Sequence, residues 1–435
     1  MKKNLLARLG LAFVGLMAIV PASYAMDVQR VVSPGGIEAW LVEDYAVPII
    51  AVNFAFAGGI SQDPPEKPGL ANMLSGMLDE GAGDIDSKTF QAKLDELSIG
   101  MSFDAGRDDF FGTLKTLAEN KDEAFSMLAQ AVQKPRFDAE PIERVRSQIT
   151  ISINEAKKDP SSVASAAVRE MAYAGHPYGQ PPEGTLESIA AVTAKDLEAY
   201  RQRVFARDHL KVAVVGAIDA KAVGGMLDEV FGPLPAKGDL AQIPDTVPKG
   251  GKVDIDMPNP QTVITFGGPG PRRSDPDFMA AFVANHILGG GTFSSRLYEE
   301  VRERRGLAYS VGTTLLPFRH SAGLAGSTAT RADRADETAA LIKSEMARLA
   351  KDGPTAEELA KAKSFLIGSY ALRFDNSSKI ARQLLAIELD DLGMDYIDKR
   401  NDLVEAVTLE DVKRASQKYF TTGTELMVRV GPHES

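Results

Sequence analysis

The chain has 435 residues, of which 44% are hydrophobic and 25% charged, a composition typical of a globular protein long enough for two ordinary domains. Its formal net charge of −11 argues against nucleic acid and anionic membrane surfaces as partners. The sequence contains no cysteine, which excludes disulfides and thiolate metal sites.

The first 25 residues have the pattern of an export signal. Basic residues Lys2, Lys3 and Arg8 precede an apolar run at 9–20, and the segment 23–25 ends in a small residue, as cleavage sites do. The apolar run is too short to span a membrane comfortably, and no later segment reaches its length. We therefore expect residues 1–25 to be a signal peptide, the remaining chain to have no membrane span, and the location to be periplasmic.

The order of strand, helix and proline-rich segments predicts two domains joined by a linker. The first domain, residues 26–240, is expected to contain strands at 39–42, 49–56 and 211–216 and helices at 69–80, 87–97, 119–132 and 139–156. Prolines and a glycine pair mark the following segment as a linker, assigned to 241–260. The second domain, residues 261–435, is expected to contain helices at 276–288, 333–350, 354–372 and 377–392.

An internal repeat predicts that the two domains share one fold. Residues 192–216 and 407–431 align without a gap at an offset of 215, and both begin with Val-Thr and end with Val-Gly. Each starts with a capping box, as in Thr193 with Asp196, and runs through an amphipathic helix into an apolar strand. The sequence therefore predicts an α+β chain of two homologous, duplicated domains, an arrangement that would suit a clamshell around a substrate.

The stretch 289–311 combines a glycine run, a predicted helix at 294–305 and a predicted strand at 307–311. Arg302 and Tyr309 lie seven residues apart, one late on the helix and one just inside the strand. A helix that turns into a strand could bring both side chains to one cleft, where they would donate hydrogen bonds to a carbonyl oxygen that gains negative charge during acyl transfer. Spacing alone favours the simpler interpretation, in which Arg302 is a solvated charge and Tyr309 a core residue; the surrounding FSSRL and RGLAYSV segments favour the functional one.

This stretch resembles the C-terminal domain signature of the pitrilysin and mitochondrial-processing-peptidase family, zinc peptidases with an inverted H-x-x-E-H motif. The resemblance is carried by the GGG, FSSRL and RGLAYSV segments of 289–311, the glycine pair at 58–59 and the HPYG turn at 176–179. It implies two processing-peptidase-like domains, each a sheet flanked by helices, that together form half of a clamshell.

The resemblance also implies roles for individual residues of the second domain. Arg302 and Tyr309 match the family residues that contact the substrate and help to stabilise the transition state. The substrate-binding loop that lines the cleft would consist of Gly289, Gly290, Gly291 and Thr292.

The positions of the family's metal site carry other residues in this chain. Asn72, Ser75 and Gly76 stand where the family has His, Glu and His, and Ser152 falls where it has its third ligand, a glutamate. Zinc needs imidazole or deprotonated donors, and the water it activates needs a carboxylate base, which these residues do not supply. No two of the five histidines have the spacing of a zinc-binding pair. We therefore expect no cofactor on this chain, and the resemblance implies a zinc ion in a partner subunit.

The sequence thus predicts the non-catalytic subunit of an exported zinc metalloendopeptidase. Such a chain would be inactive alone, would pair with a zinc-bearing homologous subunit, and would present Arg302 and Tyr309 to a peptide substrate. Two other interpretations stay open at this stage. One is a catalytically inactive homologue that binds peptides or acts as a scaffold, and the other is an autonomous metallopeptidase with an unrecognised metal site.

Overall fold

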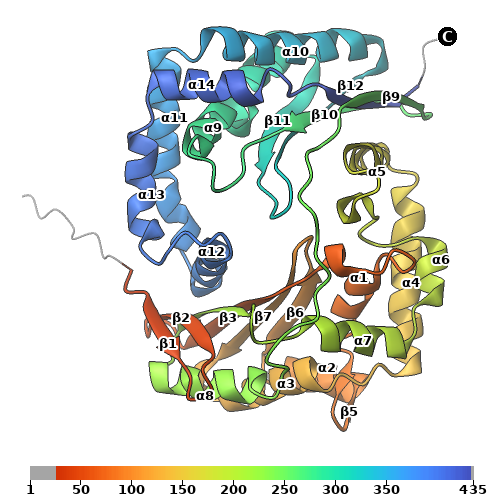
Figure 1. The fold of residues 1–435 in the computed structure, drawn as a ribbon, viewed down its shortest axis with the longest axis vertical. Coiled ribbons are helices and arrows are strands. Elements are labelled where there is room, and N and C mark those ends of the chain that lie inside the picture. Colours follow the sequence, from red (N-terminus) through yellow and green to blue (C-terminus); the bar gives the residue numbers. More distant parts are fainter. Residues whose placement is uncertain (1–25, 433–435) are drawn as a thin grey trace, which may run out of the picture.

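The computed structural model describes residues 26–432, so the signal peptide expected at 1–25 lies outside the described residues. The first half of the chain forms one end of the molecule and the second half the other, each with its own β-sheet (Figure 1). The first sheet has six strands in the order β1-β2-β8-β3-β7-β6. These strands are β1 Gln29–Val32, β2 Glu38–Glu43, β3 Ile49–Ala57, β6 Gly100–Ala105, β7 Asp109–Leu117 and β8 Lys211–Gly216.

The second sheet has five strands in the order β11-β12-β10-β13-β9. They are β9 Gly251–Asp256, β10 Gln261–Pro269, β11 Ala308–Leu316, β12 Gly323–Arg331 and β13 Leu426–Gly431, and a separate short ribbon joins β4 Gly81–Ala82 to β5 Ile85–Asp86. The linker expected at 241–260 therefore includes a strand, because β9 pairs in parallel with β13. The proline-rich composition concealed this strand at the edge of the sheet, where backbone pairing is needed on one side only.

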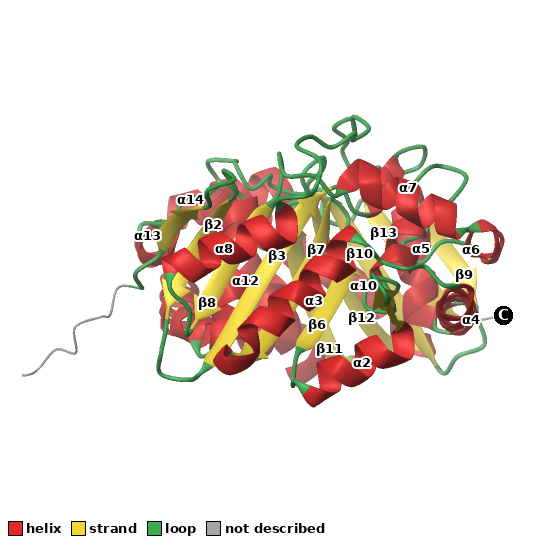
Figure 2. Cartoon of the chain, turned by 90° about the horizontal axis from the view of Figure 1, so that it is seen from below, coloured by secondary structure: helices red, strands yellow, loops and turns green. Residues whose placement is uncertain are grey.

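Helices surround both sheets. In the first half they are α1 Leu70–Ser75, α2 Ser87–Glu96, α3 Lys121–Gln133, α4 Ala139–Ala156, α5 Pro160–Ala172, α6 Leu186–Ala191, α7 Ala194–Val204 and α8 Ala220–Phe231. In the second half they are α9 Phe278–Asn285, α10 Ala335–Asp352, α11 Ala356–Gly368, α12 Ser377–Leu389, α13 Tyr396–Glu405 and α14 Leu409–Tyr419. Figure 2 shows α2, α3 and α8 lying across the outer face of the first sheet. In the part of the chain that is described, no helix is long and apolar enough to cross a membrane.

The structure confirms the duplication read from the sequence. Helix α7 leads into β8 and α14 into β13 at the predicted offset, and β8 and β13 each pair in parallel with one neighbour, β2 or β9. Both predicted capping boxes form, since Thr193 and Thr408 each bond reciprocally with the aspartate three residues later. The predicted fold class, an α+β chain of two homologous domains, is correct.

The two cores repeat one packing device. On the outer face of the first sheet, Phe54 lies opposite Gly112, and a Cβ at that glycine would come within 2.1 Å of the Phe54 ring. On the second sheet Phe266 lies opposite Gly326, where a Cβ would come within 2.3 Å of the ring. Both rings are fully buried. Each glycine is therefore required because a neighbouring strand must leave room for a buried aromatic ring.

The inner faces of the sheets are covered by helices exchanged between the halves (Figure 1). Helix α5, from the first half, packs its Ala164 against Val263, Val428 and Val430 of the second sheet. Helix α12, from the second half, packs on the first sheet through Ile380, Ala381, Leu384 and Leu385, which contact Val42, Ala51, Ala55, Ala213 and Val215. The helical pattern of α12 was predicted at 377–392, whereas α5 was not predicted. The sheet that each helix covers could not be predicted from the sequence, because periodicity shows which face of a helix is buried but not which element covers that face.

The halves also meet at polar contacts between the turns of two equivalent hairpins. Arg319, from the β11–β12 turn, donates through Nη2 to Asp109 at 2.8 Å. The buried Tyr178 hydroxyl donates to Asp108 at 2.6 Å and accepts from the His320 backbone N–H at 3.0 Å. Tyr178 belongs to the HPYG segment, which forms a short turn with a structural role at this junction.

Glu388, near the end of α12, provides a test of the helix exchange. Its side chain is buried against β8, with 6% of the residue exposed, and the nearest cation is Lys211 at 3.9 Å. Burial raises the pKa of Glu388 from 4.5 to about 7, and Lys211 opposes this rise. When the pKa of a carboxyl is higher in the native state than in the unfolded state, the native state binds the proton more tightly. The protein is then less stable at a pH above the native pKa than at a pH below the unfolded pKa.

We therefore expect Glu388→Gln to become more stable relative to the wild type between about pH 5 and about pH 8, by on the order of 3 kcal/mol. Urea unfolding at a series of pH values measures this difference. Glu405→Gln, at an exposed position of α13, serves as the control and should show no such trend. The same pH dependence for Glu388→Gln and wild type would contradict the burial of an ionisable Glu388.

Candidate functional site

The helix expected to carry a metal in related peptidases is short and serves packing. The predicted segment 69–80 forms a helix only at α1, because the chain leaves the helical conformation after Gly76. Met73 and Leu74 are fully buried in the first core. Asp63 holds the start of the helix by accepting from the backbone N–H groups of Gly69 and Ala71, each at 2.8 Å.

The residues at the expected metal positions do not fit zinc. The Ser75 hydroxyl donates to the Asn72 carbonyl oxygen at 2.8 Å, so it is engaged within its own helix. Gly76 offers no donor, and a Cβ there would come within 3.2 Å of Val145 on α4. Ser152 lies on an exposed face of α4. An amide, an engaged hydroxyl and a glycine cannot replace imidazole and carboxylate ligands. Across residues 26–432, no group of three or more His, Asp or Glu side chains could hold a metal ion.

The equivalent helix of the second half leads into the glycine loop. Helix α9 ends at Asn285 and continues as a wider π-helical turn at His286–Gly290. The His286 ring stacks on Phe365 with centroids 5.1 Å apart, and burial lowers the pKa of this histidine. A Cβ at Gly289 would come within 2.6 Å of the Thr313 hydroxyl. The glycine run is thus needed for the loop to lie close to strand β11.

Arg302 and Tyr309 lie together, as their spacing predicted. The helix that carries Arg302 covers only 296–303, mostly in π-helical geometry, and is shorter than the predicted 294–305. Gly306, with φ of +58°, reverses the chain so that β11 begins at Ala308. The centre of the Arg302 guanidinium lies 4.9 Å from the centroid of the Tyr309 ring. The pair therefore forms within this chain before any partner is considered.

Two further aromatic residues extend the pair into a stack that sequence reasoning did not identify. The centre of the Arg302 guanidinium also lies 4.8 Å from the centroid of the Tyr298 ring, and the Phe293 ring meets Tyr298 edge-on at 5.2 Å. We call Phe293, Tyr298, Arg302 and Tyr309 the aromatic–cation stack. Tyr298 is 5% exposed, whereas Phe293 and Tyr309 are 75% and 82% exposed. The i, i+4 spacing of Tyr298 and Arg302 was the available signal, because such residues share one helix face.

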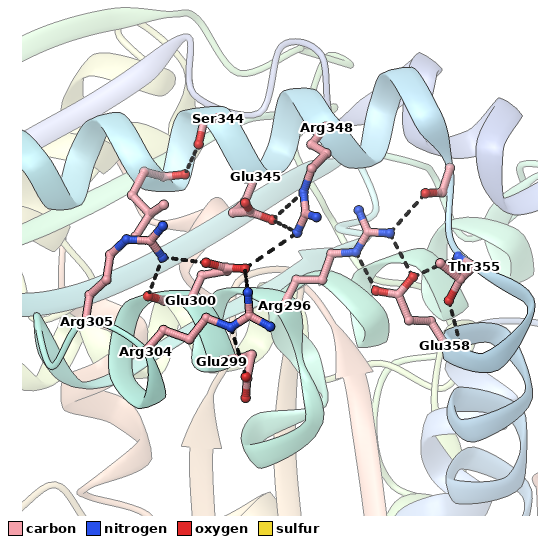
Figure 3. A network of polar contacts seen from close by, with 12 residues as sticks. Arg296, Glu299, Glu300, Arg304, Arg305, Ser344, Glu345, Arg348, Thr355 and Glu358 are labelled. Carbon is pink, nitrogen blue, oxygen red and sulfur yellow. Dashed lines mark hydrogen bonds and ion pairs between the residues drawn. The ribbon is translucent and has the colours of Figure 1, made fainter.

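Ion pairs hold the opposite side of this helix (Figure 3). Arg296 donates to both carboxylate oxygens of Glu358 on α11, at 2.6 and 2.8 Å. Burial raises the pKa of Glu358, but the hydrogen bonds from Arg296 outweigh burial and lower this pKa to about 2. Glu300 is 8% exposed and pairs with Arg305 and Arg304. These contacts fix the helix to its neighbours, so Arg302 projects from a rigid support.

Arg302 itself is left available. Its one ion pair within residues 26–432 is a distant contact with the adjacent Glu303, at 3.8 Å, and its side chain is about one-third exposed, at 32%. Stacking uses the faces of the guanidinium and leaves its N–H groups at the edge free to donate. In the described part of the chain the Tyr309 hydroxyl has no hydrogen-bond partner either. The pair can therefore donate to a group from outside the chain.

A groove of about 610 Å³ lies beside the glycine loop on the inner face of the second sheet. The lining is uncharged and made mostly of small side chains, from α5 (Ser161, Ser165), the loop (Gly289, Gly290, Thr292), β10 (Val263, Thr265), β11 (Ser310, Gly312, Thr313, Thr314) and β12 (Ala325, Gly326, Ser327, Thr328, Ala329). Of the expected loop, Gly291 is not among the lining residues, nor are Arg302 and Tyr309. Ser310 follows Tyr309 directly, so the groove and the stack adjoin along β11.

Comparison with known proteins places both halves of the chain in one family. The profile described as "Insulinase (Peptidase family M16)" matches residues 41–186, and the one described as "Peptidase M16 inactive domain" matches residues 191–366. The chain belongs to the M16 peptidase family. The resemblance read from the GGG, FSSRL and RGLAYSV segments is therefore confirmed.

Relatives of this M16 chain include proteins named as inactive. A "Non-peptidase homolog YmxG" from Helicobacter pylori is 28% identical, over 87% of this chain and 86% of its own. An "Uncharacterized zinc protease YmxG" from Bacillus subtilis is 24% identical, over 91% of this chain and 96% of its own. The crystal structure of a peptidase M16 inactive domain from Pseudomonas fluorescens has a TM-score of 0.88 at 29% identity, covering 94% of this chain and 98% of that one. Together with the replaced metal positions, these findings support a non-catalytic M16 member.

The replaced metal site gives a direct prediction. The purified chain, dialysed after incubation with zinc, should hold far less than one zinc per chain by elemental analysis, because Asn72, Ser75 and Gly76 supply no adequate ligand. Its thermal unfolding midpoint should be the same with and without a chelator, since no metal contributes to its folding. One zinc per chain that the chelator removes, with a fall in the midpoint, would show a metal site of a different kind.

Proposed function

We propose that this M16 chain is the metal-free subunit of an exported zinc endopeptidase whose zinc and general base belong to a homologous partner chain. The observation that carries the proposal is the contrast between its two halves. The first half has lost every metal ligand of the family, while the second half holds Arg302 and Tyr309 in contact, on a braced helix, with free donors. A chain kept only for its fold has no need of an exposed guanidinium–phenol pair.

The chemistry proposed for the pair is hydrogen-bond donation to the substrate carbonyl. When water activated on the partner's metal attacks a peptide carbonyl, the carbonyl oxygen gains negative charge. The Arg302 N–H groups and the Tyr309 hydroxyl would stabilise that charge, and their prior fixation by the stack would avoid reorganisation during the reaction. Tyr309, at 82% exposed, extends far enough to contact a group held by another chain.

The proposed place for the peptide substrate is the groove beside the glycine loop, with Gly289, Gly290 and Thr292 along one wall. Glycines allow a peptide backbone to approach closely, and the small uncharged lining favours an extended segment with small side chains. The export-signal pattern predicted at 1–25 supports a periplasmic location, in which the chain would encounter its partner and peptide substrates.

A second candidate function is peptide binding or a scaffold role without catalysis. The groove favours it, because its walls come wholly from this chain and could hold a peptide without any partner. The two functions differ in what accompanies the chain. A subunit of a peptidase is captured with a zinc-bearing homologue and a chelator-sensitive cleavage activity, whereas a scaffold is captured with neither.

The main test is made on the complex captured from periplasmic extract with the tagged chain and assayed on a quenched peptide. Arg302→Ala and Tyr309→Phe should each lower turnover by about 10²–10³-fold, the usual cost of losing one preorganised oxyanion donor, while the partner is still captured. The matched controls are Arg30→Ala and Tyr45→Phe, both at exposed positions of the first half and away from the stack, and these should retain full turnover. Full turnover in both test variants would contradict the proposed role.

The stack predicts a further effect on the same complex. Tyr298→Leu should lower turnover by roughly 10-fold with little change in KM, because losing one aromatic face frees Arg302 from its position. Tyr298→Phe keeps that face and should restore near-normal turnover. Equal losses in both variants would instead mean that the Tyr298 hydroxyl, and not its aromatic face, is what matters.

A further inference from the structure

A second cavity, of about 740 Å³, lies where the end of α12 meets the first sheet. One wall is the loop 207–211 that precedes β8, and another is the turn 35–38 between β1 and β2. The second half of the chain adds Arg319 and the end of α12 with Glu388, Leu389 and Asp391. The cavity is separate from the aromatic–cation stack and from the groove, and its volume is in the range of small-molecule sites.

Glu388 brings a buried carboxyl group without a close cation to this cavity. The residue is 6% exposed, and Lys211 contacts it only at 3.9 Å, beyond hydrogen-bonding distance. Its Oε2 atom is buried and has no hydrogen-bond partner among residues 26–432. A buried carboxylate oxygen without a donor is costly, and an ammonium group is the ligand that would remove the cost.

Arg207 brings an unpaired positive charge. Its backbone N–H donates to the Pro235 carbonyl oxygen at 3.0 Å, which fixes the loop. Its guanidinium makes no hydrogen bond or ion pair within the described chain, and its Nε atom is buried. Arginine stays charged at every physiological pH and its planar fork matches a carboxylate. A carboxylate is therefore the group that would satisfy Arg207.

The lining argues against apolar molecules and metal ions as ligands. Charged side chains on several sides make the cavity unsuitable for an apolar molecule. Its acidic residues do not form a group of three that could hold a metal ion, as holds for all of residues 26–432. A carboxyl group with only a distant cation and an arginine without a partner, in one cavity, call for a ligand that carries both complementary charges.

We propose that this cavity binds a small zwitterion with a free ammonium and a free carboxylate, such as a short unblocked peptide or an amino acid. The ammonium would pair with Glu388 and the carboxylate with Arg207. Because Glu388 belongs to the second half and Arg207 to the first, the bound ligand would also connect the two halves. The proposal needs neither a partner subunit nor the residues of the aromatic–cation stack.

The test uses the isolated full chain and alanyl-alanine as the probe, with titration calorimetry for affinity and thermal unfolding for stability. Alanyl-alanine should bind and raise the unfolding midpoint, as any ligand of the native state does. N-acetyl-alanyl-alanine and alanyl-alanine amide each lack one charge. Each should bind about 10–100-fold more weakly, the usual cost of one hydrogen bond to a charged group.

Variants of the protein test the same two contacts. Glu388→Gln and Arg207→Met should each weaken alanyl-alanine binding by about 10–100-fold, while the exposed controls Glu405→Gln and Arg331→Met should not. The blocked dipeptides keep the test valid if Glu388→Gln disturbs the packing of α12. The proposal is overturned if alanyl-alanine gives neither heat nor a midpoint shift at millimolar concentration. Equal binding of blocked and unblocked forms would overturn it too.

Discussion

The exchange of α5 and α12 is the constraint on which the rest of the molecule depends. Each sheet has an apolar inner face, and each face is covered by a helix from the other half. Neither inner face is removed from water until both halves have folded and met, so hydrophobic burial fixes how the halves lie relative to one another. The exchange also builds both candidate sites. Helix α5 brings Ser161 and Ser165 to the groove, and α12 brings Glu388 to the second cavity.

The duplicated halves have been adapted in opposite ways. In the first half, the helix that the family resemblance aligns with the metal helix buries its apolar side and offers no zinc ligand at Asn72, Ser75 or Gly76, so it contributes packing. In the second half, the helix at 296–303 is fixed on one side by ion pairs with α10 and α11 and presents Arg302 on the other. Buried ion pairs of this kind are weak evidence of stability, but they do fix position, which is what the donor role proposed for Arg302 would need.

Predictions of helices and strands were correct where the residues of one segment determine its structure. The helix at 139–156 and the strand at 211–216 have the predicted bounds, because caps and periodicity act within a few residues. Errors arose where tertiary context overrode local pattern. The strand β9 was hidden in a proline-rich linker, the hairpin β6–β7 and the helices α5 and α13 were passed over, and the helix at 69–80 proved much shorter.

The sequence by itself determined that the fold is duplicated, that the metal ligands are absent, and that Arg302 and Tyr309 have the spacing to meet. These conclusions depend only on which residue type stands at each position, and the sequence gives this directly. Only the tertiary structure decided which helix covers which sheet, that Tyr298 and Phe293 extend the arginine–tyrosine pair, and that Glu388 and Arg207 line one cavity. The last of these joins segments about 180 residues apart, and the pattern of a single segment shows which side it buries without showing what it is buried against.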